Sequence, residues 1–93
     1  MVWTRRAIIN LAEISTYLQT YDKGAADRIV DDIERCVTRL TEFPFRGRIG
    51  RRRRTRELVI PRTPYIVAYR LDGDNVLVLA VVHGARRWPT RFS

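Results

Sequence analysis

The sequence predicts an α+β domain in which an N-terminal helix hairpin packs on a small antiparallel sheet. Up to residue 43, apolar side chains recur every three or four positions, which is the period of an amphipathic helix. Beyond residue 44, β-branched and aromatic residues gather in three short runs, which is typical of strands. The apolar stripes of the helices need a surface to cover them, and a sheet supplies it in a two-layer domain.

The first helix is predicted at about residues 5–21, with Thr4 as its N-cap. A second helix is predicted at about residues 23–43, because Pro44 cannot continue a helix. The short joint "YDKG" between them makes the pair an antiparallel hairpin. The buried stripes are expected to consist of Ala7, Leu11, Ile14, Leu18 and Tyr21 in the first helix and of Ala26, Ile29, Ile33, Cys36, Val37 and Leu40 in the second.

Three strands are predicted at residues 56–60, 65–71 and 76–82, separated by "PRTP" and by the turn-forming "DGDN". They form a three-stranded C-terminal meander, and residues 2–4 are a candidate for a short N-terminal strand. Because the chain has 93 residues and contains no linker or repeat, residues 1–93 are predicted to form a single domain.

The positive charge of the chain is concentrated in its second half. The net charge is +8, with −1 in residues 1–42 and +9 in residues 43–93, and arginine supplies 17 of the 18 basic side chains. Such a distribution indicates an anionic partner, which is either nucleic acid or an acidic protein segment. The planar guanidinium group suits bidentate contacts with carboxylates or phosphates.

The composition argues against several classes of site. Cys36 is the only cysteine, so the chain forms no internal disulfide and nothing indicates an oxidising compartment. The longest apolar run, residues 76–82, is too short to span a bilayer, and the N-terminus lacks the apolar segment of a signal peptide. We therefore expect a cytoplasmic protein without membrane contact. With one histidine and one cysteine there is no metal-ligand cluster, and no cofactor is expected.

The order of strand, helix hairpin and three-stranded meander resembles the RelE/ParE superfamily of type II toxin–antitoxin (plasmid stabilisation) toxins. The local matches are similar to the ParE branch, and they are "WTRRAIINLAEISTYL", "FPFRGRIGRR", "RELVI", "YIVAYRL" and "VLVLAVVHGARRWP". The resemblance implies one of two activities. RelE-like members are ribosome-dependent mRNA endonucleases, whereas ParE-like members poison DNA gyrase. Both are neutralised by an antitoxin whose C-terminal segment wraps the toxin.

The residues that RNA cleavage needs are incomplete in this sequence. Cleavage by 2′-hydroxyl attack requires a proton acceptor, a proton donor and cations beside the phosphate. The resemblance places the catalytic arginine of the nucleases near Ile66, which is apolar here. The favoured ParE-like interpretation therefore has no catalytic residue and acts by binding gyrase. The alternative is a RelE-like endonuclease that uses His83, Arg62, Arg70 and Arg86, although a strand-end histidine more simply hydrogen-bonds nearby backbone.

The run "RRRR" from Arg51 to Arg54 has three interpretations: a solvated basic loop, a docking surface for the acidic tail of a ParD-like antitoxin, or a nucleic-acid contact. Docking is favoured over a solvated loop, because adjacent like charges repel unless an anion faces them. It is favoured over nucleic acid, because the run lacks interleaved aromatics for base stacking. As a loop, the run is expected to contribute little to the core. The set predicted to bind antitoxin or target is Arg51, Arg52, Arg53, Arg54, Arg56, Arg86, Arg87 and Trp88.

Four aromatic residues of the second half have structural interpretations as well. Tyr65 and Tyr69 are four positions apart in a strand, so they share a face and are predicted to pack within the sheet. Trp88 and Phe92, in the tail "GARRWPTRF", either pack on the helix hairpin or contact a partner.

Overall fold

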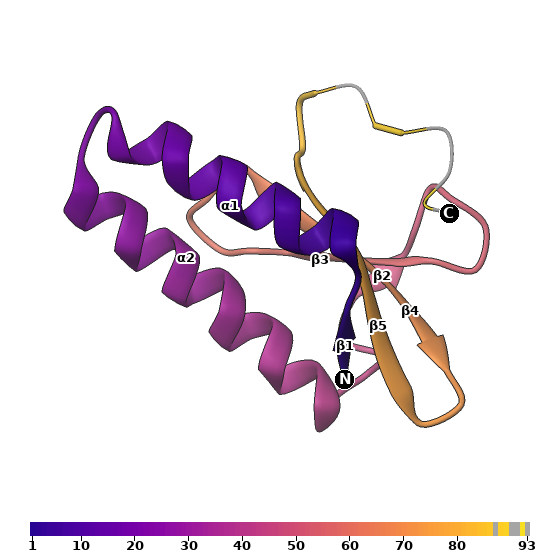
Figure 1. The fold of residues 1–93 in the computed structure, drawn as a ribbon. Helices are drawn as coiled ribbons and strands as arrows, with labels where there is room; N and C mark the ends of the chain where they lie inside the picture. Colours follow the sequence, from indigo (N-terminus) through magenta and orange to yellow (C-terminus); the bar gives the residue numbers. More distant parts are fainter. Residues whose placement is uncertain (87, 90–91, 93) are drawn as a thin grey trace.

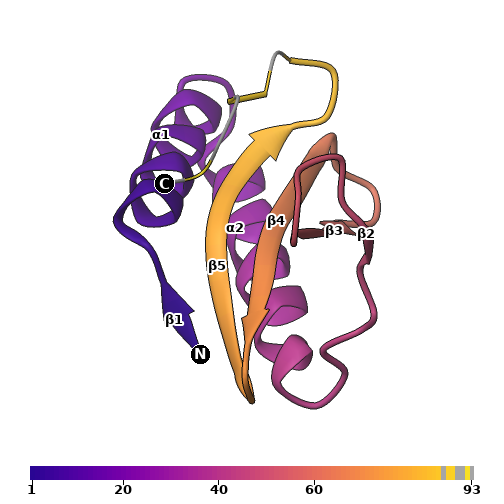
Figure 2. The same cartoon turned by 90° about the vertical axis from the view of Figure 1, so that its right-hand side faces the viewer.

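The computed structural model describes residues 1–86, 88–89 and 92. In this part of the chain two helices lie on one face of a five-stranded sheet (Figures 1 and 2). The fold class predicted from the sequence is thereby confirmed. The elements are β1 (Val2–Trp3), α1 (Arg5–Gln19), α2 (Lys23–Thr38), the 3₁₀ turn η1 (Arg39–Thr41), β2 (Arg48–Ile49), β3 (Arg56–Val59), β4 (Tyr65–Asp72) and β5 (Asn75–His83).

The helices begin at side-chain caps. The Thr4 hydroxyl accepts a hydrogen bond from the Ala7 backbone at 3.3 Å, which confirms the predicted N-cap of α1. Asp22 caps α2 in the same way, accepting from the Ala25 backbone at 3.1 Å. The α2 helix ends at Thr38, earlier than predicted, because its last turn tightens into η1 ahead of Pro44.

The sheet has the strand order β1-β5-β4-β3-β2. Strands β3, β4 and β5 form the predicted antiparallel meander, with Tyr65 opposite His83 and Arg56 opposite Tyr69. The sheet as a whole is mixed rather than antiparallel, because β1 pairs in parallel with β5. The helix hairpin and the following strands provide the long crossover that a parallel pair requires. Strand β2 was not predicted, since two residues are too few to show a period.

The core lies between the helices and the sheet. Ile33, Val37 and Leu40 are fully buried against side chains of β4 and β5, among them Tyr69 and Val78. Because side chains alternate along a strand, β4 and β5 also present a second apolar face, which we call the outer face. Neither α1 nor α2 has the length and hydropathy of a membrane-spanning helix, and no other helix of that kind occurs among the described residues.

The tail turns back onto the outer face. Trp88 is buried there against Ile66, Ala68 and Ala80, with Phe92 half-buried beside them. The proposed packing of these aromatics on the helix hairpin is therefore wrong for Trp88, because the small side chains of the outer face leave room for an indole ring. The predicted packing of Tyr65 and Tyr69 is confirmed, since both belong to the core on the helix side.

Candidate functional site

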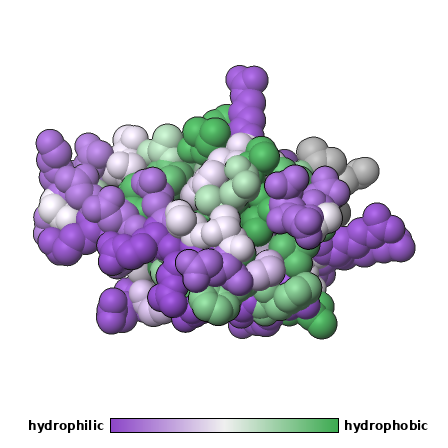
Figure 3. Space-filling view, turned by 90° about the horizontal axis from the view of Figure 1, so that it is seen from below, coloured by the Kyte–Doolittle hydropathy of each residue, from purple (hydrophilic) through white to green (hydrophobic). Residues whose placement is uncertain are grey.

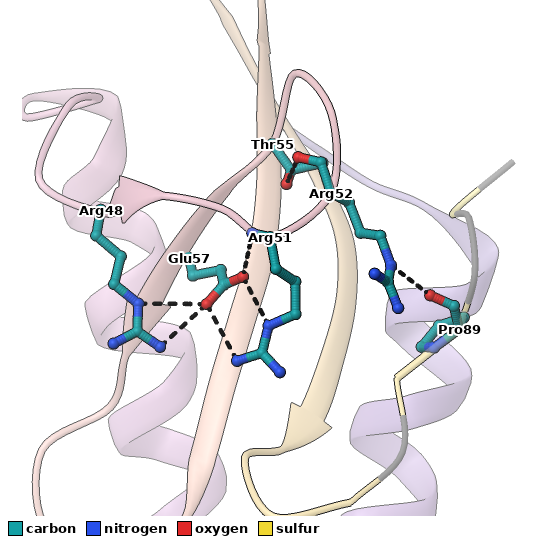
Figure 4. Close-up of polar contacts among 6 residues, drawn as sticks. All are labelled: Arg48, Arg51, Arg52, Thr55, Glu57 and Pro89. Atoms are coloured by element: carbon teal, nitrogen blue, oxygen red, sulfur yellow. Dashed lines mark hydrogen bonds and ion pairs between the residues drawn. The ribbon is translucent and has the colours of Figure 1, made fainter.

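The arginine run belongs to a loop that is built around one buried carboxylate. We call residues 48–57 the arginine loop. Glu57 on β3 is only 3% exposed, and Arg48 and Arg51 approach its carboxylate from two sides (Figure 4). Its Oε2 accepts from the backbone and from Nε of Arg51, at 2.7 and 3.1 Å, and its Oε1 accepts from Nη2 of Arg48 at 3.0 Å. One anion thus holds two of the cations and the backbone of the loop.

The pKa of Glu57 reflects two opposing effects. Burial on its own raises the pKa of this carboxyl group, because the charged form loses its hydration. The hydrogen bonds from the Arg51 backbone and from the Arg51 and Arg48 side chains outweigh burial, so the pKa lies below the ordinary value of 4.5. Glu57 is therefore ionised at neutral pH and stabilises the conformation of the loop.

Further backbone contacts define the shape of the loop. The Thr55 hydroxyl and backbone N–H both donate to the carbonyl of Arg52, and the Gly50 N–H donates to the Thr55 carbonyl at 2.8 Å. A Cβ atom on Gly50 would lie 2.3 Å from Thr55 Oγ1, so this position requires glycine. Arg54 has a positive φ of 61°, which a tight turn imposes. The loop is a folded turn rather than a free arm.

Two arginines of the run also hold the C-terminal tail. The Arg51 guanidinium lies 3.6 Å from the centroid of the Trp88 ring, and Nε of Arg52 donates to the carbonyl of Pro89 at 2.8 Å (Figure 4). A cation over an indole face is favourable because of the ring quadrupole. The run was expected to contribute little to the core; beyond that expectation, Arg51 and Arg52 connect the loop to the tail.

The remaining members of the predicted binding set separate in space. Arg53 and Arg54 are exposed at the tip of the arginine loop. Arg56 is directed to the opposite side of β3 from Glu57, and its Nη1 donates to the Gly47 carbonyl at 2.8 Å. Arg86 is exposed after β5, and Arg87 lies outside the described residues.

His83 lies in a groove of about 540 Å³ between α1 and the ends of β4 and β5. Its Nδ1 accepts from the Ala85 backbone at 3.1 Å, so the neutral ring carries its proton on Nε2. The ring packs edge-on against Tyr65, with centroids 5.8 Å apart. Burial raises the pKa of Tyr65, and the nearby Arg86 charge partly opposes this. The groove is lined by Asn10, Glu13, Ile14, Tyr17, Leu18, Pro64, Tyr65, Val81, Val82, His83 and Arg86.

Arg70, another arginine of the nuclease alternative, lies apart from His83. Arg70 pairs with Leu77, five residues along β4 from the pair of Tyr65 and His83, which corresponds to about 17 Å of strand. It also points to the outer face, whereas His83 packs on the helix side. Arg62 lies in the exposed turn between β3 and β4 with a φ of 63°.

No group of three histidine, cysteine, aspartate or glutamate side chains within residues 1–86, 88–89 and 92 is arranged to hold a metal ion. Cys36 is half-buried on α2 and packs against the core on the helix side.

The fold and the sequence both match proteins of known class. A chain of a solved structure, titled "Chromosomal ParDE TA system from P. aeruginosa", is similar with a TM-score of 0.81 and 25% identity, covering 87% of this chain and 90% of that one. The model of a family described as "ParE toxin of type II toxin-antitoxin system, parDE" matches residues 1–88. The chain belongs to this family, and the resemblance inferred from the sequence is confirmed.

Two curated relatives extend the comparison. "Putative toxin Y4kP" of Sinorhizobium fredii is 45% identical over 94% of this chain and 90% of its own length. "Toxin RelE2" of Caulobacter vibrioides is 30% identical over 92% of this chain and 96% of its own length. The chain is therefore a toxin of the type II toxin–antitoxin class. The family model and the solved structure carry ParE-type names, whereas one curated relative is named RelE2.

Proposed function

We propose that this toxin acts by binding DNA gyrase in the cytoplasm and that a ParD-like antitoxin neutralises it. In this proposal the acidic C-terminal tail of the antitoxin docks on the arginine loop. The observation that carries the proposal is the construction of the loop on Glu57, which presents several guanidinium groups in a fixed arrangement.

The arginine loop keeps cationic surface after its internal contacts are made. The side chains of Arg48 and Arg51 remain 57% and 41% exposed, and Arg53 and Arg54 extend at the tip. Glu57 is the only acidic residue between positions 43 and 71, so a single negative charge is present among many positive ones and the segment keeps a large net positive charge. A disordered acidic tail loses less free energy to ordering when its partner surface is already folded.

Binding rather than cleavage is supported by the residues around the sheet. Ile66 lies near the position at which the resemblance places a catalytic arginine, and it is buried against Trp88. The lone pair of His83 Nδ1 is already hydrogen-bonded to backbone. A protein that poisons gyrase by binding needs no catalytic group of its own.

A pair of substitutions at the tip of the loop tests the docking proposal. Arg53→Ser with Arg54→Ser removes two exposed charges and leaves the contacts of Arg51 and Arg52 in place. Exposed ion pairs contribute about 0.2 to 1 kcal/mol each, so antitoxin affinity should fall by roughly twofold to thirtyfold at low salt and by less at high salt. The control pair, Arg28→Ser with Arg35→Ser on α2, should bind normally.

Two results would contradict the assignment of the arginine loop to the antitoxin tail. Unchanged antitoxin affinity at low salt for the loop variant would contradict docking at the loop. A loss of affinity for duplex DNA instead, with a salt slope reduced by about 0.9 per phosphate contact, would favour the nucleic-acid interpretation.

The RelE-like endonuclease is retained as a second candidate because the groove brings His83, Arg86 and Tyr65 together. In this alternative His83 exchanges protons and Arg86 stabilises the phosphate, with Arg62 and Arg70 as the further predicted cations. Its test is cleavage of mRNA on ribosomes in a purified translation system. The endonuclease alternative would be established if the natural chain cleaves the mRNA and the His83→Gln variant does not.

A further inference from the structure

Two phenylalanine rings project from a tight turn that follows η1. The turn spans residues 43–46, has Pro44 at its second position, and is closed by a hydrogen bond from the Arg46 N–H to the Phe43 carbonyl at 3.1 Å. Phe43 is 51% exposed and Phe45 is 68% exposed. We call residues 43–46 together with Ile49 the aromatic platform.

The platform is anchored from beneath by Tyr69 and Arg56. The Tyr69 hydroxyl donates to the Pro44 carbonyl at 2.7 Å and accepts from the Gly47 N–H at 2.9 Å. The Arg56 guanidinium lies 4.9 Å from the centroid of the Phe45 ring while its Nη1 binds the Gly47 carbonyl. The two rings are therefore held at the surface by a rigid support, and their exposure does not result from a loose loop.

The surroundings of the rings are apolar at the centre and cationic at the rim. A hollow of about 520 Å³ is lined by Arg39, Glu42, Phe43, Pro44, Phe45 and Arg46. Figure 3 views the molecule from the end at which α2 finishes, and hydrophobic side chains reach the surface there between hydrophilic ones. Three arginines, Arg39, Arg46 and Arg56, surround the rings against one carboxylate, Glu42.

The platform continues into a free strand edge. Strand β2 is the last strand of the sheet, and Ile49 on it is 81% exposed and lies opposite Arg56. Gly50 and Thr55 form a hydrogen-bonded pair of this ladder. Because such pairs alternate with non-bonded ones, the backbone N–H and carbonyl of Ile49 point away from β3. They are available to an added strand.

We propose that the aromatic platform and the β2 edge bind an extended acidic segment of a second protein, with one bulky apolar side chain of that segment seated between Phe43 and Phe45. Carboxylates on either side of the apolar residue would pair with Arg39 and Arg46. A peptide is favoured over nucleic acid because it alone uses the strand edge, and because the aliphatic Ile49 offers no stacking surface to a base.

This surface shares Ile49 and Arg56 with the arginine loop, but it faces away from the Glu57 cluster of that loop. Leu58 packs in the core on the helix side, so Arg56, two positions earlier, lies on that side as well, whereas Glu57 lies on the outer face. The platform and the Glu57 cluster are therefore on opposite faces of the same sheet edge. The inference goes beyond the proposed function and does not depend on gyrase being the target.

A designed peptide tests the inference. The probe is a fluorescein-labelled heptapeptide, Asp-Ile-Asp-Leu-Glu-Phe-Glu, and its binding is followed by fluorescence anisotropy. Loss of a phenylalanine contact that is buried on binding should weaken affinity by roughly tenfold to a hundredfold, so Phe45→Ser should bind the probe that much less tightly. Tyr21→Ser is the matched control, because Tyr21 is 74% exposed at the tip of the helix hairpin, and it should bind like the natural chain.

Two comparison ligands complete the test. A peptide with serine in place of the three apolar residues should bind at least tenfold more weakly, and a single-stranded oligothymidylate should not compete with the probe. Absence of probe binding, or equal binding by Phe45→Ser, would overturn the proposal. Oligothymidylate binding that depends on Phe45 would assign the platform to nucleic acid instead. Ile49→Thr serves in the same assay if Phe45→Ser fails to fold.

Discussion

Glu57→Gln is the substitution that probes the arginine loop most selectively. The side chain keeps its size, but it loses the negative charge and one of its two acceptor oxygens. The new amide N–H₂ then faces the donors of Arg48 and Arg51, which the carboxylate had satisfied. The backbone N–H of Arg51 loses its acceptor as well if the amide turns its nitrogen toward it.

The loss of stability expected for Glu57→Gln depends on how exposed the side chains of Arg48 and Arg51 are. Hydrogen bonds to charged groups contribute about 1.5 to 3 kcal/mol each, and this carboxylate takes part in several. The side chains of Arg48 and Arg51 are 57% and 41% exposed, so water replaces much of the hydrogen bonding that they lose. We therefore expect a loss of about 2 kcal/mol in the free energy of unfolding. For a chain of this length that lowers the melting temperature by roughly 8 to 16 °C.

The same carboxylate predicts how stability depends on pH. Because the folded-state pKa of Glu57 lies below its ordinary value, the unfolded chain takes up the proton first as the pH falls. The stabilisation is complete above the unfolded pKa and is lost as the pH falls through the folded pKa, in the region below 4.5. Urea unfolding at several pH values should show this loss in the natural chain and not in Glu57→Gln.

Glu34→Gln on α2 is the matched control, since it changes the charge equally at an exposed position. If Glu57→Gln unfolds like this control at neutral and acid pH, the account of the loop is refuted. Antitoxin affinity adds a second criterion. Each substitution removes one negative charge. If affinity for the acidic antitoxin tail depended on net charge alone, both variants would bind it as tightly as the natural chain or more tightly. If affinity instead depends on the arrangement in which Glu57 holds the arginines, only Glu57→Gln should bind the antitoxin more weakly.

Three further substitutions test other parts of the structure. His83→Gln should keep toxicity within about threefold in a growth assay, because the contacts of the histidine are structural, namely a backbone hydrogen bond and packing against Tyr65; a loss of orders of magnitude in a folded variant would favour the nuclease. Gly47→Ala should destabilise the fold by about 1 to 3 kcal/mol, because its Cβ would lie 2.6 Å from the Tyr69 hydroxyl, and a melting temperature equal to the natural one would contradict that contact. Trp88→Ala should cost about 3 kcal/mol in urea unfolding, and a change below about 0.5 kcal/mol would show that the tail does not pack on the sheet.

The helices and the meander could be predicted because long periodic segments carry a strong pattern. The stripes on α1 and α2 needed only their spacing, and Thr4 had the side chain of an N-cap. Strand β2 was missed because two residues show no period and one of them is arginine. The parallel pairing of β1 depends on contacts about 75 residues apart in the sequence, which no local pattern records.

Less of the candidate site than of the fold could be predicted from the sequence. The arginine run was visible, but its conformation depends on Glu57, which stands alone among basic residues and could have been noticed for that reason. The position of Trp88 depends on the small side chains of Ala68 and Ala80 on an outer face that only the folded sheet defines. The exposure of Phe45 depends on hydrogen bonds made by Tyr69, which is distant in the chain.

We propose that the toxin acts by binding gyrase and carries out no chemistry of its own. The most direct measurement incubates the purified protein with DNA gyrase and supercoiled plasmid, in parallel with ribosomes translating an mRNA. If the toxin acts by binding gyrase, cleaved plasmid should accumulate in the gyrase reaction, and a ParD-like antitoxin should prevent this. The mRNA on the ribosomes should stay intact. Cleavage of the mRNA on ribosomes while gyrase keeps its full activity would contradict this proposal.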